Sequence, residues 1–105
     1  MASNTLKRQS GMATVAGTTI YTVPANTTLT IVGLRAANSD NTADHTVHAT
    51  INDVLITGSE TPLPTGSAIE FIDGKIVAQA GDVIVVYGDT DNDVHVWVSY
   101  LEQTV

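Results

Sequence analysis

The feature of this sequence that most constrains its fold is a series of short apolar runs, each closed by turn residues. About eight runs follow one another at spacings of roughly 8–12 residues, without the period of an amphipathic helix. The clearest run, residues 94–101, alternates strictly, so a face of valines and Tyr100 lies opposite a mixed face containing Trp97, and we expect the valine face to be the core side. This pattern predicts an all-β protein: a single antiparallel β-sandwich or jelly-roll-like domain.

Turn-forming residues separate the expected strands. Asn52-Asp53 predicts a tight turn, and Asp73-Gly74 is the strongest hairpin signal in the chain. Gly33 lies inside a long apolar run, which indicates a β-bulge or a close backbone approach. The expected strands span residues 18–23, 27–37, 45–51, 54–57, 68–72, 75–78, 83–87 and 94–101.

The length of the chain and its cysteine content set the domain organisation. A chain of 105 residues fits one domain, and 43% hydrophobic residues are enough for one core. Residues 1–12 are polar and aperiodic, so we expect a flexible, extended N-terminal arm followed by a sandwich domain over residues 13–105. There is no cysteine, which excludes disulfides and thiolate metal sites. We expect no secretory signal, because the N-terminal residues contain no apolar segment, and no membrane partner, because no apolar stretch approaches 18 residues.

The distribution of charge argues against a nucleic-acid partner. The net charge is −7, but residues 1–8 carry Lys7 and Arg8 and no acid, so the arm is at +2 and the remainder at −9. Such a body repels phosphate, and two basic residues are too few for a nucleic-acid tail. Lys7 and Arg8 are therefore candidate contacts to a protein partner.

The segment from Asp89 to Asp93 is the only candidate metal loop that the motifs suggest. Asp89, Asp91 and Asp93 place carboxylates at alternate positions, as an EF-hand does, but Val94 replaces the essential glycine and Tyr100 the final glutamate. These three aspartates remain weak metal candidates beside the alternative of a solvated turn. His45 and His48, three residues apart in a strand, face opposite sides and cannot share one ion without a bulge between them. We expect no metal and no cofactor.

No motif in the sequence indicates catalysis. Nucleophile elbows, zinc-protease motifs and phosphate-binding glycine loops are all missing from the sequence. Glu60, Glu70 and Glu102 are too scattered to suggest a catalytic pair. We therefore expect that the protein is not an enzyme.

Trp97, the single tryptophan, shares the mixed face of its strand with His95. One interpretation is a partly exposed residue in an interface or a sugar-stacking site, where tryptophan is enriched. The other is a core or edge tryptophan covered by a loop. With Lys7 and Arg8, Trp97 completes the predicted partner-binding residues.

Two stretches resemble a family of small virion proteins of tailed bacteriophages. Residues 18–52 contain a strand ending in Tyr-Thr-Val-Pro, a long strand and an Asn-rich turn, and residues 80–102 read AGDVIVVYGDTDNDVHVWVSYLE. The resemblance implies a non-enzymatic β-sandwich, often trimeric, that serves as a capsid decoration protein, a neck or tail accessory protein, or a fibre-associated domain. The family has no catalytic residues to carry over.

The resemblance and the composition together lead to a functional expectation. We expect a capsid decoration (cement) protein that binds and stabilises the assembled phage head, contacting the major capsid protein or other virion proteins, as a homo-oligomer, most simply a trimer. It would be made in the host cytoplasm and reside on the outer surface of the virion. The alternative is a tail, fibre or neck domain that recognises a glycan or protein on the host surface.

Overall fold

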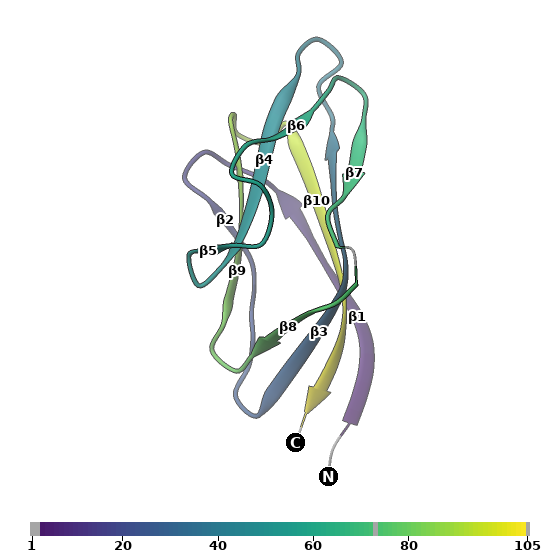
Figure 1. The fold of residues 1–105 in the computed structure, drawn as a ribbon, viewed down its shortest axis with the longest axis vertical. Helices are drawn as coiled ribbons and strands as arrows, with labels where there is room; N and C mark the ends of the chain where they lie inside the picture. Colours follow the sequence, from purple (N-terminus) through teal and green to yellow (C-terminus); the bar gives the residue numbers. More distant parts are fainter. Residues whose placement is uncertain (1–2, 73, 105) are drawn as a thin grey trace.

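The computed structural model describes residues 3–72 and 74–104, which form an all-β sandwich of two antiparallel sheets (Figure 1). The sandwich is elongated, with extents of 50 × 21 × 19 Å. The described strands are β1 (Ser3–Met12), β2 (Thr18–Thr22), β3 (Thr27–Asn38), β4 (His45–Ile51), β5 (Val54–Leu55), β6 (Thr61–Leu63), β7 (Ala68–Glu70), β8 (Ile76–Gln79), β9 (Val83–Gly88) and β10 (Val94–Thr104).

Each sheet has three longer strands and two short ones. The first sheet has the order β1-β10-β3, and both β7 and β8 pair with β3 at its far edge. The second sheet has the order β2-β9-β4, and both β5 and β6 pair with β4. The predicted antiparallel β-sandwich is therefore confirmed.

The core lies between the sheets and is built mainly from the alternating apolar sides of β2, β3, β4, β9 and β10. In β10, Val94, Val96, Val98 and Tyr100 are all buried, so the valine face is the core face, as the alternation predicts. The Tyr100 ring also stacks on Tyr21 from the second sheet, with ring centroids 5.3 Å apart. This contact packs β2 of the second sheet against β10 of the first sheet.

The described residues contain ten strands, two more than the eight expected. One of the additional strands, β6, contains Pro62, which lowers its apparent strand propensity and which the ladder tolerates because β6 is an edge strand. The other is β1. The described chain contains no helix with the length and hydropathy needed to cross a bilayer.

The predicted N-terminal arm is extended but paired, which differs from a free arm. Ser3 to Met12 run antiparallel to β10 over ten residue pairs without a register shift. Backbone hydrogen bonds make this pairing, so the pattern of apolar and polar side chains in the sequence does not indicate it. Met1 and Ala2 lie outside the described residues. In Figure 1 the start of β1 and the end of β10 lie together at one end of the molecule.

One predicted hairpin is confirmed and another is wrong. Asn52 and Asp53 both have positive φ values, 51° and 65°, and join Ile51 to Val54 as a two-residue hairpin. By contrast, the strands on either side of Asp73-Gly74 do not form a hairpin: β7 and β8 pair with successive parts of β3 and act as one interrupted edge strand. Asp73 itself lies outside the described residues.

Candidate functional site

The outward side of the first sheet carries most of the exposed large apolar side chains. Eight such side chains are exposed in the described part of the chain, and five of them lie on the five strands of the first sheet. Strand alternation turns them away from the core. A cluster of this kind on a single surface marks an interaction site more often than a scatter of single residues does. We call this surface the outer face; its apolar members are Leu6, Met12, Val32, Val77 and Trp97.

Trp97 lies near the middle of the outer face and is 42% exposed. The structure thus favours the surface interpretation of this residue over the covered one. The Arg8 guanidinium lies 4.5 Å from the centroid of its ring, which is a cation–π contact. Arg8 and Trp97 come from neighbouring strands, so the β1–β10 register brings two of the sequence-predicted contact residues together.

A trough of about 680 Å³ opens on the outer face beside Trp97. It is lined by residues of β1, β10, β3 and β7 and therefore crosses four strands. Several of its lining residues are small, which leaves room between the larger ones. The small residues include Ser10, Gly33, Ala37 and Ser99, and the larger ones are Met12, Arg35, Glu70, His95 and Trp97.

Gly33 and Glu70 shape this trough. The β3–β10 register shifts by one residue between Ile31 and Gly33, so the predicted bulge is confirmed. The Glu70 Oε2 atom accepts hydrogen bonds from the backbone N–H groups of Leu34 (2.6 Å) and Ile72 (3.2 Å). A Cβ on Gly33 would lie 3.4 Å from the Glu70 Oε1 atom, so glycine leaves room for this carboxylate.

The outer face has the opposite charge to the rest of the protein. Its described residues include Arg8 and Arg35 against one carboxylate, Glu70, which gives +1. The ten other acids and two lysines leave the remainder at −8. In the part of the chain that the structure describes, neither arginine forms a salt bridge. Both positive charges are therefore available to a partner.

Lys7 does not belong to the outer face. Adjacent residues in a strand point to opposite sides, and Lys7 turns inward to place its Nζ atom 2.8 Å from the Glu102 Oε1 atom. The Tyr21 hydroxyl donates to the other oxygen of Glu102 at 2.7 Å. The Lys7 and Tyr21 hydrogen bonds hold the pKa of Glu102 below its usual value. Lys7 thus fastens β1 to the sandwich and lies apart from Arg8, and its predicted role as a partner contact stays a prediction.

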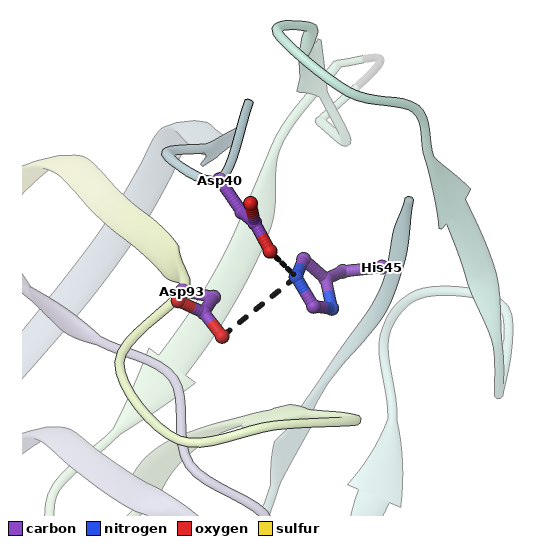
Figure 2. Close-up of side chains that lie close together, drawn as sticks. All are labelled: Asp40, His45 and Asp93. Carbon is purple, nitrogen blue, oxygen red and sulfur yellow. Dashed lines mark hydrogen bonds and ion pairs between the residues drawn. The ribbon is translucent and has the colours of Figure 1, made fainter. Parts of the chain in front are cut away.

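A second cluster surrounds His45, whose side chain is only 6% exposed (Figure 2). The His45 Nε2 atom lies 3.0 Å from an oxygen of Asp40 and 3.7 Å from one of Asp93, and its Nδ1 atom lies 2.9 Å from Asp89. These carboxylates, Asp40 above all, raise the pKa of His45. The hydroxyl and backbone N–H of Thr42, and then His45, lower the pKa of Asp40 to about 2.

The His45 cluster contains two of the three aspartates of the candidate metal loop. Asp89 and Asp93 turn toward His45, whereas Asp91 accepts a hydrogen bond from the backbone N–H of Val15 at 2.9 Å. The three therefore do not converge on one point. Sequence reasoning missed Asp40, which reaches the cluster from the β3–β4 loop; the only signal was the density of Asn, Asp and Ser there.

Asp40, His45 and Asp93 are the described residues that come closest to a metal site. One ligand atom from each lies within 4.8 Å of the others. Both ring nitrogens of His45, however, face carboxylate oxygens at hydrogen-bond distance, which suits a protonated imidazolium rather than a metal ligand. The arrangement is that of a buried histidine held between three loop carboxylates, with which it forms ion pairs when protonated.

The other histidines lie away from this cluster. His48 stacks on Tyr87 on the outside of the second sheet, with ring centroids 4.5 Å apart, so the two strand histidines do point to opposite faces. His95 lines the trough.

The surroundings of His45 do not resemble a nucleophilic site. The Thr90 hydroxyl lies 3.4 Å from the His45 Nδ1 atom, but it donates to Asp93 at 2.8 Å. Nδ1 itself is closer to Asp89, at 2.9 Å. A general base must be free to take a proton from its nucleophile, and this ring is committed to carboxylates on both sides. The cluster is suited to joining loops.

Comparison with known proteins adds one distant likeness. No protein-family model matches the chain, and no curated protein matches its sequence. A solved structure of a Bacillus endospore appendage, from a family of disulfide-linked pili, superposes with a TM-score of 0.52 at 11% sequence identity, covering 99% of this chain and 88% of that one. At this identity the likeness shows the fold alone.

Proposed function

We propose that this protein is a non-enzymatic structural protein of a bacteriophage virion, which docks on the assembled head as a capsid decoration protein. The observation that carries the proposal is the outer face, where exposed apolar side chains share one side of the first sheet with Trp97 and Arg8. Tryptophan and arginine are the residues most enriched at the energetic centres of protein interfaces. In a soluble domain such a face is costly to leave in water unless a partner covers it.

Two further observations support a role in an assembly. The sandwich fold is shared with the subunit of an endospore appendage, a protein that assembles into pili. That family is disulfide-linked, whereas this chain has no cysteine, so its own contacts must be non-covalent. The resemblance of residues 18–52 and 80–102 to phage virion proteins makes the virion the proposed assembly, with a homotrimer as the docking unit.

A second candidate function follows from the trough beside Trp97. A groove of this volume falls within the size range of ligand sites, roughly 300–1,000 Å³, and an exposed tryptophan can stack on a sugar ring. A tail or fibre domain that recognises a host-surface glycan would use these features. It would need few copies per particle, whereas a decoration protein needs hundreds.

The docking role can be tested with one pair of matched substitutions. Leu6 is 75% exposed on the outer face, and Val54 is 67% exposed on β5 of the second sheet. Leu6→Glu puts a charge into the proposed interface and should weaken binding to virions made without the protein by at least about tenfold, since a buried unpaired charge costs several kcal/mol. Val54→Glu should bind normally in the same co-sedimentation assay. Equal binding by both variants would remove the outer face from the interface.

A further inference from the structure

We propose that the trough on the outer face is the binding site for an extended acidic segment of the partner protein. A carboxylate of that segment meets Arg35, and a neighbouring apolar side chain packs on Trp97. This inference rests on the proposed docking function and names the chemistry of the partner.

The positive charges of Arg35 and Arg8 favour an acidic partner segment at the trough. Arg35 lines the trough, and Arg8 lies against Trp97 at its edge. Glu70 is the cross-strand neighbour of Arg35, but its Oε2 atom accepts two backbone N–H groups, and no salt bridge joins the two side chains in the described part of the chain. The guanidinium of Arg35 therefore keeps its donors for a carboxylate from outside, which it can bind with two parallel hydrogen bonds.

The apolar surface around the trough is better suited to binding a protein segment than a glycan. Arg8 occupies one side of the Trp97 ring, which reduces the aromatic surface on which a sugar can stack. Met12 lines the trough, and exposed Leu6 and Val32 extend the apolar surface beyond it; such a surface suits side chains better than hydroxyl groups. Nucleic acid is disfavoured by the charge of −8 on the remainder of the chain.

The negative charge on the rest of the protein would also orient such a partner. An acidic segment is repelled by most of this protein and attracted only at the outer face, so electrostatics fix which side docks. Since these charges are exposed, the attraction should weaken as the salt concentration rises.

The single tryptophan makes the test specific to this site. Trp97 fluorescence of the full-length protein would be titrated with three synthetic ten-residue peptides that share a central leucine and differ at four positions, which hold glutamate, glutamine or lysine. The glutamate peptide should give a saturable change, the glutamine peptide a weaker one, and the lysine peptide none. Equal responses to the glutamate and lysine peptides, or no response to any, would overturn the proposal.

Two variants identify the cation responsible. Arg35→Gln should weaken binding of the glutamate peptide by about tenfold, the loss expected for one charge-assisted hydrogen-bonding pair. Lys75→Gln removes the same charge from an exposed site outside the trough and should leave the affinity unchanged. Arg35 is itself exposed, and an amide NMR spectrum checks that the fold is intact. Equal affinity of Arg35→Gln and the wild type contradicts the proposal.

Other occupants would show in the same experiment. A uronic-acid oligosaccharide that changes Trp97 fluorescence where the acidic peptide does not would replace the proposal with a glycan site. Self-association that the glutamate peptide blocks would assign the trough to a second copy of the chain.

Virion binding separates the trough proposal from the docking function. If Arg35→Gln still binds virions while Leu6→Glu does not, the trough proposal fails and the docking function stands. If the wild type itself does not bind, the docking function fails.

Discussion

At the scale of single residues, position in the strand decides what each charge can do. Lys7 and Arg8 are neighbours in the sequence, yet one binds Glu102 on the inner side and the other stacks on Trp97 outside. His45 likewise acquires its role from residues of two loops, the β3–β4 loop that precedes it and the β9–β10 loop far along the chain. When protonated, its imidazolium neutralises part of the charge of Asp40, Asp89 and Asp93, which otherwise repel one another.

The His45 cluster predicts a specific pH dependence of stability. The pKa of His45 is raised in the fold, so its contribution is complete below the unfolded value near 6.5 and is lost as the pH rises through the folded pKa. The pKa of Asp40 is lowered to about 2, so its contribution is present above the unfolded value of 3.8 and is lost as the pH falls toward 2. The cluster should therefore stabilise the fold most between about pH 4 and 6.5.

This dependence can be measured by thermal unfolding across pH. His45→Gln should lower the Tm most near pH 5, and the difference from the wild type should shrink as the pH rises above 6.5. His95→Gln, at the exposed histidine of the trough, is the control and should not reproduce this profile. A difference that grows from pH 5 to pH 8 would contradict the charged-histidine account.

At the scale of elements, β1 is the strand whose role differs most from expectation. Its side chains are mostly exposed, and what holds it is the backbone ladder to β10 together with the Lys7–Glu102 pair and the Gln9–Tyr100 hydrogen bond. A free arm could be removed without cost to the fold, but a paired strand cannot.

Deletion of residues 1–12 should therefore destabilise the domain. We expect the Tm to fall by at least about 5 °C, the shift that roughly 1 kcal/mol produces in a domain of this size. Lys7→Ala, which leaves the Glu102 carboxylate with Tyr21 alone, should lower the Tm in the same direction, whereas Lys75→Ala should not. A truncated protein with unchanged Tm would show that β1 is a dispensable arm.

The elements that could be predicted from the sequence are those marked by local signals, such as alternation, turn residues or a glycine within a strand. Strict alternation identified β10 and its core face, the Asn52-Asp53 pair identified a hairpin, and Gly33 identified a bulge. The pairing of β1 with β10 joins residues about 90 positions apart through backbone groups that every sequence shares. The collinear placement of β7 and β8 along β3 depends equally on tertiary pairing, which overrode the Asp-Gly signal.

The candidate site was predictable only in part. Trp97 and Arg8 were identified from their residue types, because aromatic and basic residues on an acidic, threonine-rich domain are conspicuous. Arg35, Glu70 and the trough were not, since they meet only when β3, β7 and β10 pair. Asp40 was missed for the same reason: loop residues come together only when the ends of the sheets are in place.

At the scale of the whole molecule, the sandwich separates two surfaces of opposite character. One is the apolar and weakly positive outer face of the first sheet, and the other is the acidic remainder. A protein that binds an assembled shell by one face, and does not bind the free subunits, stabilises that shell by mass action in proportion to its occupancy. The small size and elongated shape of the domain suit placement as repeated units along such a surface.

The stability of virions that lack this protein tests the account most directly. Such particles should assemble normally and release their genome at a lower temperature than complete particles, in a thermal-release assay with a DNA-binding dye. Addition of the purified wild-type protein should restore the release temperature, and addition of the Leu6→Glu variant should not. Depleted particles that are equally robust but no longer attach to host cells would contradict the decoration function and support the recognition domain in its place.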